Sequence, residues 1–77
     1  AEALVFFEIR VRADGALVDP ISSVSAVKQQ RLVRAASFYL HRHGLWDRVS
    51  RIDVIGITPG QSSKYRIQWI KNAIQAD

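Results

Sequence analysis

Glu8 and Arg10 are the residues near the start of the chain whose types and spacing best suit chemistry. They lie in a stretch where apolar and charged residues alternate, and residues two apart on a β-strand point the same way, about 6.5 Å apart. A carboxylate beside a fixed cation can hold a divalent metal ion and a phosphate oxygen at once. The same spacing also occurs in ordinary surface ion pairs, which contribute little to stability. Both interpretations stay open on these two residues.

Further polar side chains follow along the chain. Arg12 is next on the same predicted strand face, whereas Lys28 and Gln29 fall in the first turn of a predicted helix, where free amides and the helix dipole favour an anion. A basic stripe between residues 28 and 51 could follow a phosphate backbone or could be a solvated helix face. Its members are Lys28, Arg31, Arg34, Arg42, Arg48 and Arg51.

Three other polar residues invite a metal or charge interpretation. His41 and His43 are two residues apart on the predicted helix, so they point about 200° apart and cannot share one ion. Asp53 lies inside an apolar strand, where an unpaired charge is costly, and we expect it to pair with Arg51 on the same face. The two tryptophans are predicted to be packing residues.

These residues need elements that position them, and the first is a strand over Leu4 to Arg12. Its second half alternates strictly between apolar and charged residues, which is the period of a strand. We expect Val5, Phe7, Ile9 and Val11 to face the core. The opposite face is apolar at its start and charged at its end. We therefore expect another part of the protein to cover its start, and solvent or a ligand to reach its end.

The rest of the pattern predicts an α/β protein with β-α-β-β order. Residues 13–24 read as a loop, Ser25 as the N-cap of a helix that runs to His43, and Gly44 as the residue that ends it. A central strand buried on both faces follows, then a turn over 58–64, a third strand and a short helical tail. The helix makes a crossover between parallel strands, and the third strand returns antiparallel. The two later strands and the tail span Arg51–Ile57, Tyr65–Ile70 and Lys71–Ala76.

Composition limits the possibilities further. With 77 residues and 8.7 kDa, the chain has room for one domain, over residues 1–77. Its apolar share of 48% and charged share of 23% exclude a disordered or low-complexity chain. The net charge of +4 favours a polyanionic partner but also serves solubility. Without cysteine it cannot rely on disulfides, so we expect a cytoplasmic protein, and no apolar run is long enough to span a membrane.

The first residues also carry information. No methionine is present, and the apolar run begins three residues from the start. We therefore expect the 77 residues to be the C-terminal part of a longer protein. The N-terminal segment of that protein would contain further strands and a helix.

Five separate blocks in this order give the chain a family resemblance. They read LVFFEIRVR from Leu4, SVSAVKQQRL from Ser23, HGLWD from His43, RIDVI from Arg51 and QWIKNA from Gln68. The chain resembles the YraN family of small bacterial proteins, which are predicted endonucleases distantly similar to archaeal Holliday junction resolvases. The likeness runs over most of the chain and is specific to the family.

The resemblance implies the C-terminal part of a restriction-endonuclease-like core of the PD-(D/E)xK type. In that fold acidic residues hold Mg²⁺ and position water for phosphodiester cleavage. Glu8 matches the metal-binding and catalytic Glu, and Arg10 stands in the catalytic Lys position. Lys28 and Gln29 match the family's Lys-Gln pair, and with Arg12 they would contact nucleic acid.

Two departures from the family pattern bear on activity. Family members carry a Gly-Glu-Ile-Asp-Leu block upstream of this strand, whose Asp is the expected second metal ligand, and this chain begins after it. Arg10 can bind phosphate but cannot act as a base near neutral pH. We therefore expect the 77 residues to be inactive by themselves.

Three hypotheses follow. The first is a Mg²⁺-dependent endonuclease that acts on DNA, branched DNA included. The second is a nucleic-acid-binding module of the same fold without catalysis. The third is an interaction subunit that forms homodimers through a face left open.

Overall fold

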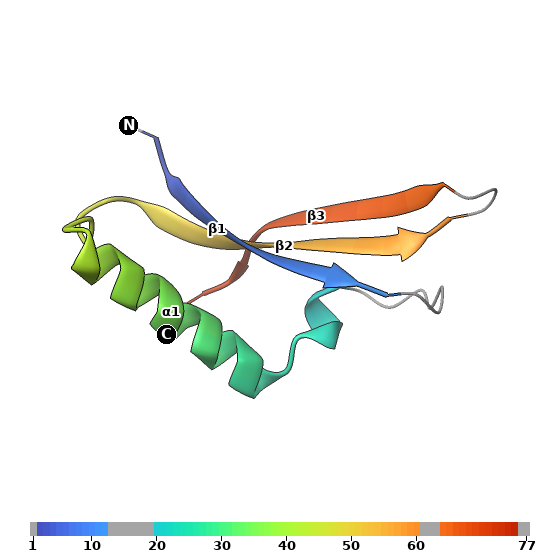
Figure 1. The fold of residues 1–77 in the computed structure, drawn as a ribbon, viewed down its shortest axis with the longest axis horizontal. Helices are drawn as coiled ribbons and strands as arrows, with labels where there is room; N and C mark the ends of the chain where they lie inside the picture. The colour runs from blue at the N-terminus through green and yellow to red at the C-terminus, as the bar shows by residue number, and fades with distance from the viewer. Residues whose placement is uncertain (1, 13–19, 61–63, 76–77) are drawn as a thin grey trace.

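The computed structural model describes residues 2–12, 20–60 and 64–75, which form a three-stranded sheet with one long helix beside it (Figure 1). Strand β1 pairs parallel with β2, and β3 pairs antiparallel with the other edge of β2. The predicted α/β class with β-α-β-β order and a mixed sheet is therefore confirmed. The elements are β1 (Leu4–Val11), the 3₁₀ helix η1 (Ile21–Ser23), α1 (Ala26–Arg42), β2 (Ser50–Pro59) and β3 (Tyr65–Ile74).

Helix α1 begins and ends where the sequence predicts. The side chain of Ser25 accepts a hydrogen bond from the Lys28 backbone N–H at 3.1 Å, which satisfies one of the free amides of the first turn. Gly44 follows the helix with a φ of 65°, a left-handed conformation that glycine adopts at low cost. Of the described residues, α1 is the one long helix, and it lacks the length and apolarity of a membrane span.

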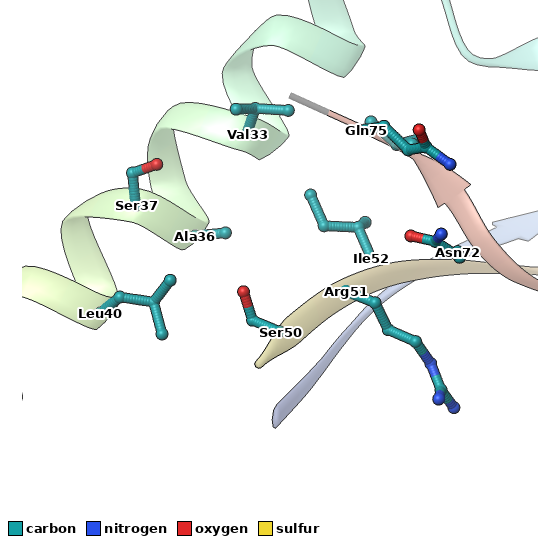
Figure 2. A pocket seen from close by; sticks show the side chains of 10 residues that line it. Val33, Ala36, Ser37, Leu40, Ser50, Arg51, Ile52, Asn72 and Gln75 are labelled. Atoms are coloured by element: carbon teal, nitrogen blue, oxygen red, sulfur yellow. The ribbon is translucent and has the colours of Figure 1, made fainter. Parts of the chain in front are cut away.

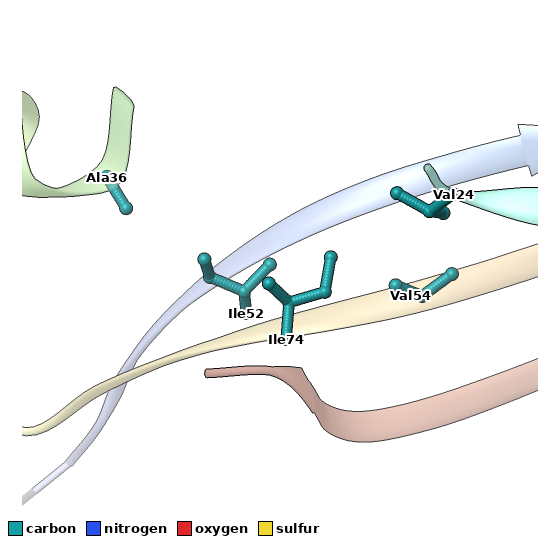
Figure 3. Packing of buried hydrophobic residues seen from close by; sticks show 5 residues of the cluster. All are labelled: Val24, Ala36, Ile52, Val54 and Ile74. Carbon is teal, nitrogen blue, oxygen red and sulfur yellow. The ribbon is translucent and has the colours of Figure 1, made fainter. Parts of the chain in front are cut away.

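The core lies between α1 and one face of the sheet (Figure 3). Ala36 reaches it from the helix and Val24 from the segment before it, while the central and last strands contribute the other buried side chains. Phe6 of β1 and two helix residues pack against this cluster from its margin. The five buried members are Val24, Ala36, Ile52, Val54 and Ile74.

The predicted core face of β1 is wrong, because α1 covers the opposite face. Phe7, Ile9 and Val11 are 50%, 56% and 66% exposed, whereas Phe6 packs toward the core. Both faces of β1 are apolar at their start, so a period of two could not tell which one the helix covers. The uncovered side, called the open face below, carries Phe7, Ile9, Val11, Tyr65, Ile67 and Trp69.

The same geometry corrects the prediction for β2. The strand is central, as expected, and Ile52, Asp53 and Val54 are buried. Ile55 and Ile57 are half-buried, because they point to the open face, which no other described element covers. The prediction that β2 is buried on both faces is therefore right for its first half and wrong for its second half.

The predicted helical tail is also wrong, because β3 continues to Ile74. The pairs Val54 with Ile70 and Ile52 with Ile74 leave a register shift between them, and Asn72 lies in it with a φ of 54°. Its backbone N–H donates to Asp53, so the shifted segment stays attached to the sheet. Residues 13–19, 61–63 and 76–77 lie outside the described residues, and with them most of the predicted loop, part of the predicted turn and the last residue of the predicted tail.

Candidate functional site

Glu8 lies on the helix-covered side of β1 and faces two cations. Its Oε2 is 3.6 Å from Nη1 of Arg10 and 3.8 Å from Nζ of Lys28. The carboxylate is 14% exposed, so water screens it less than it would at the surface. The structure thus brings Glu8, Arg10 and Lys28 together from two elements. The strand places Glu8 and Arg10 on one face, as predicted, and the start of α1 supplies Lys28.

Arg10 is bound to the segment that leads into α1. Its Nη2 donates to the backbone oxygen of Ser23 at 3.0 Å, and its Nε donates to Ser23 Oγ at 3.4 Å. Ser23 Oγ in turn donates to the carbonyl of Pro20 at 2.6 Å. Arg10 therefore holds η1 against β1 as well as facing Glu8.

Pro20 is buried on the sheet next to this contact. A Cβ added at Gly56 would lie 2.8 Å from Pro20 Cβ and nearer still to its Cγ, so this approach requires a glycine. Gly56 is the register partner of Arg10 on the neighbouring strand. The segment from Pro20 to Ser23, called the strap below, is therefore fixed by Gly56 beneath it and by Arg10 beside it.

The two remaining predicted site residues have different surroundings. Gln29 is half-buried, and its Nε2 donates to the carbonyl of Val24 at 3.0 Å, so its amide supports the turn into α1. Arg12 follows β1 and is half-buried, and its backbone N–H donates to Ile57 at 2.9 Å. The ion pairs of Glu8 are with Arg10 and Lys28, so the described site is the group Glu8, Arg10 and Lys28 with the strap.

The described residues do not by themselves form a complete metal centre. No group of three or more His, Cys, Asp or Glu side chains gathers anywhere in residues 2–12, 20–60 and 64–75. The rings of His41 and His43 contact Trp46 and Tyr39 respectively, at centroid distances of 6.0 and 4.3 Å. The two histidines thus have separate neighbours, as their spacing predicts.

Asp53 is the second acidic residue of the sheet, and it is fully buried. Its carboxylate accepts hydrogen bonds from Arg51 Nε at 3.0 Å, Trp69 Nε1 at 2.9 Å and the Asn72 backbone N–H at 2.9 Å. Burial by itself would raise the pKa of Asp53, but these bonds outweigh it and hold the pKa below its ordinary value of 3.8. The predicted pair with Arg51 is confirmed.

The other two donors to Asp53 were missed from the sequence. Trp69 and Asn72 lie on β3, and their contact with Asp53 depends on the antiparallel pairing and its register shift. The ring of Trp69 also contacts Phe7, with centroids 6.1 Å apart. The contacts of Trp69 and Asn72 with Asp53 join residues 16 and 19 positions apart, so no spacing within one strand indicates them.

A cavity of about 330 Å³ lies away from Glu8, between α1, the start of β2 and the end of β3 (Figure 2). Apolar side chains such as Ala36 and Leu40 line its helix side, and Ile52 and Ile74 line its sheet side. Figure 2 shows that Arg51 points away from the helix, which agrees with its bond to Asp53. None of the predicted site residues lines this cavity, so it is not part of the site.

Comparison with known proteins identifies relatives along the whole chain. A protein from Marinobacter nauticus is 96% identical over 77 residues, which are 100% of this chain and 63% of that protein. One from Chromohalobacter salexigens is 44% identical over 75 residues, covering 97% of this chain and 59% of that protein. One from Coxiella burnetii is 41% identical over 75 residues, covering 96% and 59%. No solved structure matches.

The family assignment rests on two findings. Each of these relatives is called a UPF0102 protein, and this chain spans about three fifths of their length. The family model described as "Uncharacterised protein family UPF0102" matches residues 1–57, which include the site around Glu8 and most of β2. The resemblance to the YraN family is thereby confirmed, and the chain belongs to the uncharacterised protein family UPF0102.

Proposed function

We propose that these residues form part of a metal-dependent endonuclease that cleaves phosphodiester bonds in DNA, including branched DNA. The observation that carries the proposal is the Glu8 carboxylate, shielded to 14% exposure, with two cations within 4 Å. Two positive side chains beside one carboxylate can bind a phosphate diester while the carboxylate holds a metal ion. A surface ion pair needs only one of those cations.

Glu8 would hold Mg²⁺ in this proposal. Mg²⁺ usually keeps several waters and takes one or two carboxylates together with substrate phosphates, so Glu8 can serve as one ligand. When bound, the ion would lower the pKa of a water and stabilise charge on the phosphate. Among the described residues the site has one carboxylate, so a second carboxylate ligand would come from outside them.

The residues of this chain then divide the other tasks. Glu8 orients the ion, and the cations beside it offset the negative charge of the phosphate in the transition state. Lys28 belongs to the site itself, while Gln29, next to it on α1, and Arg12, directly after β1, lie on the segments that lead away from the site. We propose that they help to guide the nucleic acid toward it.

Two alternatives are each favoured by one observation. The lone carboxylate of the described site favours a nucleic-acid-binding module of the same fold without catalysis. The open face favours a self-associating subunit that forms homodimers, because large exposed apolar patches mark interaction surfaces.

A DNA-cleavage assay on a polypeptide as long as the relatives distinguishes the nuclease from the binding module and the self-associating subunit. The experiment uses the Marinobacter nauticus relative with its matched segment replaced by these 77 residues, called the long form below. We expect it to cut branched DNA with Mg²⁺ and not with EDTA. Glu8→Gln should abolish cutting, whereas the exposed Asp47→Asn, which removes the same charge at the far end of α1, should leave it unchanged.

Each alternative has its own signature in the same experiment. DNA binding that weakens steeply with salt, without any Mg²⁺-dependent cutting, would replace the nuclease with the binding module. Salt-insensitive self-association with neither DNA binding nor cutting would favour the interaction subunit.

A further inference from the structure

We propose that Lys28, and not Arg10, is the catalytic cation that contacts the phosphate beside Glu8, and that Arg10 is a positioning residue. This inference rests on the proposed nuclease function and deepens it. It exchanges the roles that sequence motifs suggest for the two residues, because their contacts in the folded chain differ.

The side-on pair of N–H groups of Arg10 is already engaged. Nη2 and Nε both donate to Ser23, and Nη1 faces Glu8 at 3.6 Å. A guanidinium binds phosphate best through two parallel N–H groups. The side-on pair formed by Nε and Nη2 is used on Ser23, so Arg10 could turn that pair toward a phosphate only by releasing the strap.

The strap fixes the start of α1, and Arg10 fixes the strap. Ser23 Oγ donates to the Pro20 carbonyl, and Pro20 packs directly on Gly56. The chain then passes through the buried Val24 to the N-cap at Ser25. Arg10 therefore determines where the first turn of α1 lies, and Lys28 is in that turn.

Lys28 has the freedom that Arg10 lacks. Its Nζ is 3.8 Å from Glu8 Oε2, a distance of charge attraction without a hydrogen bond, and its side chain is 44% exposed. An ammonium on a flexible stem can turn its three donors toward a phosphate while it stays close to the carboxylate. Lys28 is thus placed to act on the phosphate held at Glu8.

The first test observes the two side chains directly in the long form. A short branched DNA is titrated in by NMR with EDTA present, so that no cutting occurs. We expect the Lys28 Cε resonance to shift on binding while the Arg10 Nε–H resonance keeps its position. A shift of Arg10 Nε–H with a stationary Lys28 would overturn the inference and leave the proposed function standing.

The second test measures cleavage with Mg²⁺. Lys28→Met should slow it roughly a hundredfold, the size of effect seen when one preorganised donor to a transition state is removed. Lys71→Met is the matched control, because it removes the same side chain from the opposite side of the molecule, where Lys71 lies over Trp69. A rate for Lys28→Met within twofold of that control would contradict the proposal.

A third variant tests the positioning role. Ser23→Ala changes no charge but removes the acceptor of Arg10 Nε and the bond to Pro20. We expect it to shift the Lys28 resonance and to slow cleavage while the affinity for DNA in EDTA stays within twofold. Unchanged Lys28 resonances would show that the strap does not position Lys28. A long form that neither binds nor cuts DNA would overturn the proposed function and this inference together.

Discussion

The two carboxylates of the sheet, Glu8 and Asp53, lie on neighbouring strands but on opposite faces, and their partners differ in kind. Asp53 is fully buried and receives three hydrogen bonds of 2.9–3.0 Å, one of them from the backbone. Glu8 has no donor so close among residues 2–12, 20–60 and 64–75, and it faces two cations at 3.6 and 3.8 Å. The first carboxylate is saturated by fixed donors, whereas the second can exchange its partners.

This difference separates a structural charge from a candidate functional one. A metal ion could reach Asp53 only by breaking three short hydrogen bonds to a fully buried carboxylate, and each donor would lose a charged acceptor. Glu8 would give up long ion pairs with side chains that remain partly in water. An acidic residue inside an apolar strand therefore need not be the reactive one.

The largest expected effect is loss of stability when Asp53 is neutralised. Asp53→Asn leaves Trp69 Nε1 and the Asn72 N–H short of a charged acceptor, and we expect the free energy of unfolding of the long form to fall by about 2–4 kcal/mol. Urea denaturation followed by tryptophan fluorescence measures it. Asp47→Asn, in an exposed turn, should change stability by less than about 0.5 kcal/mol. Equal effects of the two substitutions would mean that Asp53 is not the anchor of β3.

A smaller effect should appear as a dependence of stability on pH. The pKa of Asp53 in the folded state lies below 3.8, so its stabilisation is complete above that value and is lost as the pH falls through the folded-state pKa. Denaturation midpoints between pH 6 and pH 2 should therefore fall more steeply for the wild type than for Asp53→Asn. Parallel curves would show that the donors around Asp53 do not favour its ionised form.

The smallest effect on stability is expected at Glu8. Glu8→Gln removes two ion pairs whose cationic partners are 32% and 44% exposed, so the free energy of unfolding should change by less than about 1 kcal/mol. The same urea denaturation measures it. A loss as large as that of Asp53→Asn would make Glu8 a structural residue and would remove the contrast between the two carboxylates.

Local patterns predicted much of this arrangement. The cap at Ser25, the end of α1 at Gly44 and the shared face of Glu8 and Arg10 all follow from signals within a few residues. The parallel and antiparallel pairings follow from element order and connection length. The pair of Arg51 with Asp53 follows from a spacing of two on a strand.

What the sequence could not predict depends on contacts between distant segments. Phe6 and Phe7 are equally apolar, and only the packing of α1 decides which is covered. Where β3 continues past Lys71, its Asn72 amide donates to the Asp53 carboxylate 19 residues away. Lys28 meets Glu8 because the strap fixes the first turn of α1 beside β1, and no spacing in the sequence reports that contact.

The most direct test of the central claim compares the two carboxylates in one NMR experiment on the long form. Mn²⁺, a paramagnetic substitute for Mg²⁺, is added at low concentration while the side-chain carboxyl ¹³C resonances are followed. We predict that the Glu8 resonance broadens first while that of Asp53 stays sharp, and that Glu8→Gln prevents Mn²⁺ from broadening the neighbouring Arg10 signals. Broadening of Asp53 before Glu8, or a sharp Glu8 at saturating Mn²⁺, would contradict the account.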